Sequence, residues 1–325
     1  MATPNNVWNW RPAQPSRLEQ PVTLLRLEGP DALRVLHGQT SQAIELAAPG
    51  SALATCVISP TARLRALARV LVDASGAWLL IEAGDGAAVR TALDRVLFPA
   101  DRVELGALQQ ALLITPVLAA GEPDLPPDLA HSDAGQWQPL DAEQNVWLLG
   151  QQLLQLSPDA PLPAALASRP PLQRQQQERW RLQQGTPAAP GEINDDCNPF
   201  ELGLANRVSL NKGCYVGQET LAKLATYDGV KQQLRRWSAL QPAGASALAV
   251  GQTLLQGNGE RAGAISSALA LPQDDGSVQW LGLALVRRSA LEQAALVAGE
   301  QGPSLAISRP EAFIDPPVGA AQRRS

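Results

Sequence analysis

The chain has 325 residues, a formal net charge of −5, 45% hydrophobic residues and 18% charged residues. This length allows two or three domains with their own cores, and this balance excludes a disordered chain. The acidic charge argues against a large basic surface for nucleic acid, but leaves a local patch open. Three cysteines without a CxxC pair exclude a disulfide framework and a four-thiolate metal site, and they indicate a reducing compartment such as the cytoplasm. No apolar run reaches 18 residues, so no membrane-spanning helix is expected, and the first 17 residues lack the apolar core of a secretory signal.

The rare residue types gather in one stretch. Arginine supplies 23 of the 26 basic residues, and all three lysines fall between residues 197 and 231. Both tyrosines and two of the three cysteines lie in the same stretch. Composition therefore points to residues 197–231 before any motif is considered.

The first part of the chain has the pattern of an α+β unit. A short helix is expected after Gly29-Pro30-Asp31, and a second one over residues 86–97 with Asp85 as its cap. Strand order and the short connections favour α+β over a parallel βαβ array. The strand-like runs are residues 21–28, 52–59, 66–72, 77–82 and 108–118, followed by short runs around Trp137 and Trp147.

The second part contains one helix and then a β-rich region. Residues 157–171 contain five prolines and are predicted to be a connector, and residues 173–184 are predicted to be a helix. After Lys231 the sequence is typical of a small all-β domain with a hairpin turn at residues 257–259. Its predicted strands are residues 234–240, 252–256, 263–268 and 279–286, and the tail from Pro316 is predicted to be disordered.

The segment Lys212-Gly213-Cys214-Tyr215-Val216-Gly217-Gln218-Glu219 has the composition of a functional turn. Its two glycines permit a tight turn and close approach of a ligand, and a helix is expected to begin near Gly217. The positive end of that helix and the nearby Lys212 would both favour the thiolate of Cys214. The alternative is a purely structural turn with a buried, inert cysteine and an exposed lysine.

The same eight residues resemble the signature of the YgfZ family, folate-binding proteins linked to the maintenance of iron–sulfur enzymes. That family is related to the T-protein, the aminomethyltransferase of the glycine cleavage system. The resemblance extends over roughly residues 24–288. The supporting segments are residues 29–40, 178–187 and 198–204, with Gly251, Gly263 and Ser266-Ser267 in the β-rich region.

The resemblance implies a three-domain ring around a channel, with two α+β (ferredoxin-like) domains and a C-terminal antiparallel β-barrel. The implied first domain comprises residues 1–50 and 107–230, and the second is inserted as residues 51–106. The barrel would occupy residues 231–315, ahead of a disordered tail at 316–325.

The resemblance also implies tetrahydrofolate as the cofactor and no resident metal. Glu201 would anchor the pterin, because a carboxylate can accept two parallel hydrogen bonds from its amino and ring N–H groups. Arg181 would either pair with a folate carboxylate or cap its own helix. Cys214 and Lys212 are the candidate catalytic residues, with roles left open. The candidate folate-binding residues are Glu201, Arg181, Tyr215, Gln218, Glu219, Gln39 and Arg63.

One departure bears on activity. The T-protein carries an acid that supports aminomethyl transfer, whereas the corresponding residues 61–66 here contain no carboxylate. Without that charge we expect an accessory protein rather than an independent enzyme, with a folate-dependent aminomethyl transferase as the alternative. In addition, Ala62 stands where many YgfZ relatives have glycine.

The expected partners are iron–sulfur enzymes or cluster-assembly proteins, including tRNA-modifying enzymes, and no membrane. Direct tRNA binding through Lys223, Lys231, Arg235 and Arg236 is a weaker expectation. Three further side chains, His37, Cys56 and His131, are predicted to have no functional role.

Overall fold

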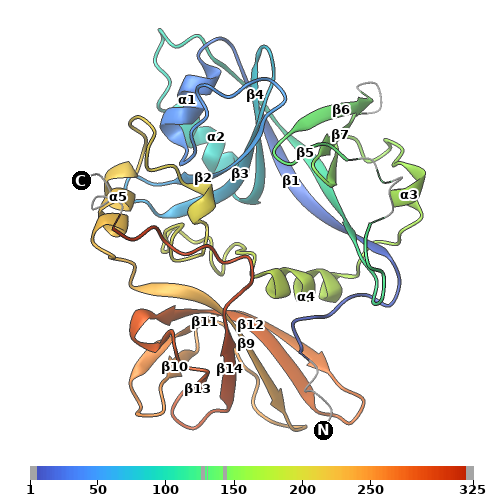
Figure 1. Ribbon diagram of the computed structural model, residues 1–325, viewed down its shortest axis with the longest axis vertical. Coiled ribbons are helices and arrows are strands. Elements are labelled where there is room, and N and C mark those ends of the chain that lie inside the picture. Colours follow the sequence, from blue (N-terminus) through green and yellow to red (C-terminus); the bar gives the residue numbers. More distant parts are fainter. Residues whose placement is uncertain (1–5, 126–128, 130, 142–144, 320–325) are drawn as a thin grey trace. The chain divides into compact units, whose positions relative to one another are not determined.

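The computed structural model describes residues 6–125, 129, 131–141 and 145–319 (Figure 1). The chain forms two compact units, each built from separate stretches of sequence. The sheet unit comprises residues 11–173 and 207–218. The barrel unit comprises residues 1–10, 174–206 and 219–325.

The sheet unit contains one eight-stranded antiparallel sheet in the order β2-β3-β4-β1-β5-β8-β7-β6. The two edges of the sheet meet, because Trp137 N–H donates to the Gly50 carbonyl at 2.8 Å and Ala52 N–H donates to the Gly135 carbonyl at 2.7 Å. The sheet is therefore curled into a half-barrel. Its strands are β1 (Ser16–Glu28), β2 (Ala52–Ile58), β3 (Leu64–Val72), β4 (Gly76–Gly84), β5 (Glu104–Val117), β6 (Trp137–Asp141), β7 (Val146–Leu149) and β8 (Gln152–Gln155).

Alternation along the strands gives this sheet two apolar faces. Helices α1 (Ala32–Gln39) and α2 (Gly86–Asp94) cover one face and share a core cluster with Leu25, Val70 and Leu79. The other face buries a cluster that includes Leu24, Leu71, Leu80, Trp137 and Trp147. The predicted cap of α2 is confirmed, because the Asp85 carboxylate accepts from the N–H groups of Ala87 and Ala88.

The barrel unit closes six antiparallel strands in the order β10-β11-β12-β9-β14-β13. Trp237, which is fully buried, lies at the centre of its core. The strands are β9 (Gln232–Gln241), β10 (Thr253–Leu255), β11 (Arg261–Pro272), β12 (Val278–Arg287), β13 (Ala295–Ala298) and β14 (Ser304–Ser308). The helices of the chain beyond α2 are α3 (Ala164–Ala167), α4 (Arg174–Gln184) and α5 (Gln218–Thr226), with short 3-10 turns η1 (Ala205–Arg207) and η2 (Arg288–Ala290).

These observations confirm the α+β class and the C-terminal antiparallel barrel. The strands of residues 51–106 share one sheet with β1 and β5. The domain boundaries at residues 50, 106 and 230, the ferredoxin-like domains and the ring stay predictions. In the predicted disordered tail, residues 316–319 form no helix or strand and residues 320–325 lie outside the described residues. Within the described part of the chain, no helix has the length and apolar character needed to cross a membrane.

Candidate functional site

The signature segment forms a tight turn between η1 and α5. Gly217 has a φ of +79°, and α5 begins at the next residue, as predicted. Cys214 is exposed, whereas Tyr215 is buried with 8% of its surface accessible. The buried, inert cysteine of the structural alternative is therefore wrong for Cys214. The turn presents a thiol to solvent just before the N-terminus of a helix.

Lys212 fastens this turn to the end of α1. Its ammonium group donates to the carbonyls of His37, Thr40 and Gln42, the last two at 2.7 Å. The ring of Tyr215 lies 4.3 Å from the ammonium nitrogen and adds a cation–π contact. Lys212 is thus not the exposed lysine of the structural alternative. Its three N–H groups are fully used within the sheet unit.

Two influences act on the charge of Lys212. Burial lowers the pKa of Lys212 to about 7. The three carbonyls act in the opposite direction, because only the charged form has three N–H donors to offer them. A neutral amine would place a lone pair against one carbonyl oxygen. We therefore describe Lys212 as an ammonium ion that holds the turn closed, and its catalytic assignment stays a prediction.

Backbone and amide hydrogen bonds hold the turn in the same position. Val216 N–H donates to the Gly38 carbonyl at 3.0 Å, one residue before Gln39. The Gln218 side chain donates to the Lys212 carbonyl at 3.3 Å, so it closes the turn on itself. Consequently, Gln218 supports the turn whether or not it also contacts a ligand.

The loop at residues 59–63 packs against the other side of the turn. A Cβ atom on Gly217 would lie 2.8 Å from the Ser59 carbonyl oxygen and 2.8 Å from the Ile58 side chain, so only glycine fits there. Ala62 is fully buried and has a φ of +60°. It therefore adopts the left-handed conformation that favours glycine, at a cost of about 1 kcal/mol. The loop also carries Arg63, which the fold brings to the neighbourhood of the turn.

Gly217→Ala should lower the free energy of unfolding by about 2 kcal/mol, because it combines a positive φ with a backbone clash. Gly213→Ala is the matched control within the same motif. Gly213 has no positive φ, and a Cβ added there would meet only the His37 ring, at 3.9 Å. Urea denaturation of both variants measures the difference. Equal losses would mean that the close approach at Gly217 does not constrain the turn.

Tyr215 carries an orphaned polar atom. Its hydroxyl is buried and has no hydrogen-bond partner among the described residues. Burial, with a smaller contribution from nearby Cys56, raises the pKa of Tyr215 to about 12. The hydroxyl is therefore neutral. Cys56 is fully buried, and burial raises the pKa of its thiol to about 11, in agreement with the predicted core role.

A partly buried ion triad in the sheet unit includes Arg207, five residues before Lys212. Glu82 on β4 pairs with Arg69 on β3 at 2.6 Å and with Arg207 of η1 at 2.9 Å. Burial alone would raise the pKa of Glu82, but the two guanidinium groups lower it below its ordinary value. Arg207 also donates to the Ala68 carbonyl at 3.1 Å, so it ties the segment before the signature turn to the sheet. The sequence gives no signal for this triad, because its members are far apart along the chain.

His37 has a structural role, as the sequence predicts from its place beside Gly38 at the end of a helix. Its Nδ1 accepts the backbone N–H groups of Ile44 at 3.2 Å and Glu45 at 3.1 Å. Burial and then the neighbouring Lys212 lower the pKa of His37, while Glu45 opposes them. His37, Lys212 and Gly213 line one wall of a pocket of about 590 Å³ beside the turn. The imidazole is therefore neutral and holds the loop over residues 43–47.

Acid should weaken this loop. Since the folded pKa of His37 lies below its ordinary value of 6.5, the unfolded chain takes up the proton first as the pH falls. The contribution of His37 to stability is complete above pH 6.5, and it is lost as the pH falls towards the pKa of His37 in the folded protein. His37→Asn should flatten this pH dependence, because an amide oxygen can accept in place of Nδ1 without titrating. Urea denaturation at about pH 7.5 and about pH 5.5 measures the change in the free energy of unfolding between the two pH values. An equal change in the wild type and in His37→Asn would contradict the prediction.

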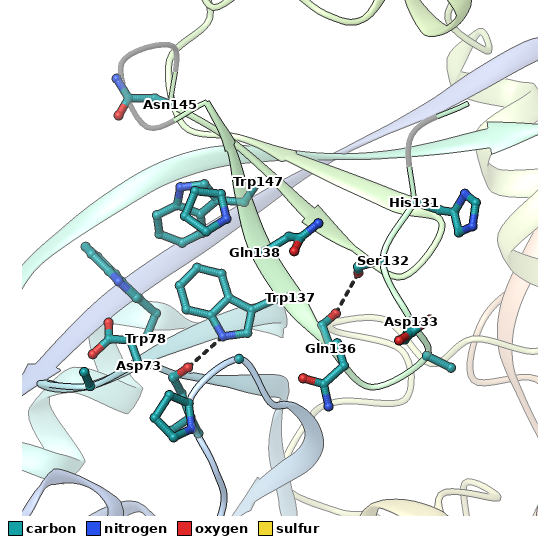
Figure 2. A pocket seen from close by; sticks show the side chains of 16 residues that line it. Asp73, Trp78, His131, Ser132, Asp133, Gln136, Trp137, Gln138, Asn145 and Trp147 are labelled. Atoms are coloured by element: carbon teal, nitrogen blue, oxygen red, sulfur yellow. Dashed lines mark hydrogen bonds between the residues drawn. The ribbon is translucent and has the colours of Figure 1, made fainter. Parts of the chain in front are cut away.

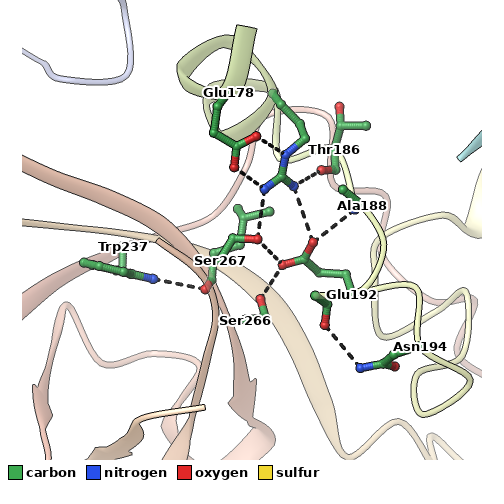
Figure 3. A network of polar contacts seen from close by, with 11 residues as sticks. Glu178, Thr186, Ala188, Glu192, Asn194, Trp237, Ser266 and Ser267 are labelled. Carbon is green, nitrogen blue, oxygen red and sulfur yellow. Dashed lines mark hydrogen bonds and ion pairs between the residues drawn. The ribbon is translucent and has the colours of Figure 1, made fainter. Parts of the chain in front are cut away.

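Arg181 lies at the centre of a polar network in the barrel unit (Figure 3). Its guanidinium binds the Glu178 carboxylate at 2.7 and 2.8 Å and reaches the fully buried Glu192 at 3.4 Å. It also donates to the Thr186 carbonyl at 2.7 Å and to the Ser267 hydroxyl at 2.9 Å. All five N–H donors of Arg181 are engaged within this unit. These contacts give Arg181 an internal role in the network, and they show neither of the two predicted roles, pairing with a folate carboxylate or capping of its own helix.

Glu192 is the residue of this network that the sequence did not single out. It accepts from Ser266 at 2.5 Å, from Ser267 at 2.8 Å and from the backbone N–H of Ala188 at 3.0 Å. Burial alone would lower the pKa of Arg181, but Glu178 and Glu192 raise it above its ordinary value. The resemblance marked Ser266 and Ser267 without a role, and the structure shows that both bind Glu192.

Glu201 and Glu219 occupy very different environments. Glu201 is buried, its carboxylate accepts the Asn198 N–H at 2.9 Å, and its carbonyl accepts from Leu234 of β9 at 2.8 Å. Glu219 is exposed on α5 and pairs with Lys223 at 2.7 Å across one helical turn. Glu201 is thus a buried carboxylate on a fixed loop, whereas Glu219 has the position of a surface ion pair.

The sheet unit therefore gathers three distant segments, residues 37–42, 59–63 and 207–218, at the signature turn. Six of the nine predicted site residues belong to them: Gln39, Arg63, Lys212, Cys214, Tyr215 and Gln218. The other three, Arg181, Glu201 and Glu219, belong to the barrel unit. No group of three or more metal-ligating side chains occurs among the described residues.

Comparison with solved structures defines the fold class. The chain resembles the crystal structure of the glycine cleavage system aminomethyltransferase T from Bartonella henselae with a TM-score of 0.69. The two sequences are 16% identical, and the match covers 94% of this chain and 88% of that one. The protein therefore has an aminomethyltransferase-like fold.

Comparison with curated proteins gives a relative from Arabidopsis thaliana named "Putative transferase At1g60990, chloroplastic". The two are 29% identical over 230 residues, which make up 65% of this chain. The match spans about half of the relative's length, namely 52%. No family model matches the chain.

Proposed function

We propose that this protein is a tetrahydrofolate-binding accessory factor of the YgfZ type, which supports the assembly or repair of iron–sulfur enzymes. The observation that carries the proposal is the exposed thiol of Cys214, held on a turn that Lys212, Gly217 and Gln218 fix in place. It occurs in a chain with an aminomethyltransferase-like fold. A rigid turn that exposes one thiol suits transient contact with a partner's cluster or cysteine. One thiol cannot hold a cluster alone, so the client enzyme must supply the other ligands.

The residues present fit a folate in part. Glu201 supplies a buried carboxylate that can accept N–H groups of a pterin, and Tyr215 supplies a hydroxyl with an unused hydrogen bond. Arg181 offers no remaining donor for a folate carboxylate. When bound, a reduced folate would supply a carrier for one-carbon groups. Gln39, Arg63, Gln218 and Glu219 remain proposed contacts.

Independent aminomethyl transfer is the second candidate, favoured by the fold. The loop at residues 59–63, which packs on the signature turn, lacks the carboxylate that such chemistry uses. We therefore propose no independent turnover. Release of formaldehyde or ammonia from an aminomethyl donor, dependent on tetrahydrofolate, would reverse this assignment.

Titration calorimetry with tetrahydrofolate tests the binding claim. The wild type should bind, and Glu201→Gln should bind at least about tenfold more weakly, because the neutral amide loses one acceptor for paired N–H groups. Glu260→Gln is the matched control, since that carboxylate is exposed and Glu260 is not among the proposed folate contacts. Absence of binding by the wild type removes the folate claim.

Complementation of a deletion strain tests the accessory role. Iron–sulfur enzyme activities under oxidative stress, including tRNA-modifying ones, should fall on deletion and return with the wild-type gene. Cys214→Ser should fail to restore them, whereas Cys56→Ser and Cys197→Ser alter buried thiols and report on stability alone. Full rescue by Cys214→Ser would reduce the thiol to a packing role. A cytoplasmic location forms part of this proposal, as do the expectation of no membrane partner and the weaker one of tRNA binding.

A further inference from the structure

A large cavity of the sheet unit lies where the two edges of the curled sheet meet, at the mouth of the half-barrel (Figure 2). It has a volume of about 1200 Å³, and its lining comes from the start of β6, the end of β3, β4 and β7. Mouths of curled sheets are common ligand sites, because strand ends and their loops converge there. The signature turn does not line this cavity.

Three tryptophans form one wall of the cavity. Trp147 lies between the other two, with ring centroids 4.9 Å from Trp137 and 5.5 Å from Trp78. The Trp137 indole N–H donates to the Val72 carbonyl at 2.9 Å, which fixes that ring. Trp78 remains half-buried. The wall is therefore a rigid aromatic surface, built before any ligand arrives.

The charge of the lining selects among ligands. Asp73 and Asp133 line the cavity, and none of its described lining residues is lysine or arginine. Arg26 lies behind the lining, 5.3 Å from the Trp78 ring centroid, and its guanidinium binds the Asp73 carboxylate at 2.6 and 3.0 Å. Arg26 thus already lies against the Trp78 ring and neutralises Asp73. Asp133 supplies a further negative charge, which disfavours anions such as folate or phosphate esters.

We propose that this mouth binds an organic cation with an apolar body, such as a methylated ammonium group. Trp78 would contact the alkyl groups and attract the charge through its ring, and Asp133 would face the charge from the opposite wall. Gln138 also lines the cavity (Figure 2), and its side-chain oxygen can accept an N–H where the ammonium carries one. The inference does not depend on folate binding or on Cys214.

Choline and its neutral isostere 3,3-dimethyl-1-butanol, which share shape and differ in charge, test the proposal with the full chain. Titration calorimetry and quenching of tryptophan fluorescence should detect binding of choline and at least about fivefold weaker binding of the alcohol. Equal affinities would overturn the proposal, because the cavity would then recognise shape alone. Absence of choline binding at up to tens of millimolar would overturn it as well.

Two variants locate the site. Trp78→Leu should weaken choline binding about fivefold, and Asp133→Asn about threefold at low salt. Trp280→Leu, in the barrel unit, is the matched control, because Trp280 is also a partly buried indole. It should leave choline binding unchanged. An equal loss in Trp78→Leu and Trp280→Leu would overturn the assignment to this mouth, and thermal denaturation of each variant confirms that it is folded.

Discussion

Glu192→Ala is expected to lower the free energy of unfolding by about 4 kcal/mol, because it leaves a buried guanidinium and two hydroxyls without their shared acceptor. Glu192 is fully buried and accepts four hydrogen bonds or ion contacts, from Arg181, Ser266, Ser267 and Ala188. The carboxylate joins the loop after α4 to β11 of the barrel. Urea denaturation of the purified protein measures the loss.

Glu192→Gln separates charge from packing. Glutamine keeps the volume and one acceptor oxygen, so it should retain part of the stability while weakening the contact with Arg181. Ser267→Ala removes one hydroxyl, which accepts from Arg181 and donates to Glu192, and should cost about 2 kcal/mol. If Glu192→Ala lowered the free energy of unfolding by less than Ser267→Ala does, the network would contribute little to stability. The internal role of Arg181 would then have to be argued from other contacts.

Much of the fold could be predicted because its signals are local. The hairpin turn at residues 257–259, the cap at Asp85 and the strand over residues 21–28 each depend on neighbours in sequence, and each is confirmed. The strand is buried on both faces, because Leu24 and Leu25 are both fully buried. The helix predicted over residues 86–97 ends at Asp94; beyond it, Val96 is exposed and Leu97 packs against the core from a non-helical segment. Strands β13 and β14 were not predicted. Both are short, and their local composition does not indicate which strands of the barrel they pair with.

The site was predictable to a smaller degree, for a physical reason. The motif marked Cys214 and Lys212. The partners of Lys212 are backbone carbonyls at residues 37–42, and because every residue has a backbone carbonyl, the sequence does not indicate which ones accept. Glu192 and the Arg69–Glu82–Arg207 triad depend on pairings across long sequence separations. At Ala62 the sequence shows an alanine where the resemblance implies a glycine. The structure shows that the backbone there still adopts the left-handed conformation.

Lys212→Met should lower the free energy of unfolding by about 3 kcal/mol, since three carbonyls lose charge-assisted donors at once. Lys223→Met is the matched control. That side chain is 65% exposed and makes one surface ion pair, so its replacement should leave the free energy of unfolding essentially unchanged. Urea denaturation distinguishes the two. Equal effects would mean that the ammonium of Lys212 does not hold the turn.

Lys212→Arg addresses why a lysine persists in a chain that uses arginine for 23 of its 26 basic residues. The three carbonyls converge on one nitrogen, and an ammonium offers three N–H bonds from a single point. A guanidinium spreads its donors over a planar fork and cannot reach all three from the same place. We therefore expect Lys212→Arg to recover less than half of the stability that Lys212→Met loses, and to disturb the turn that presents Cys214. Full recovery would show that the positive charge alone is sufficient.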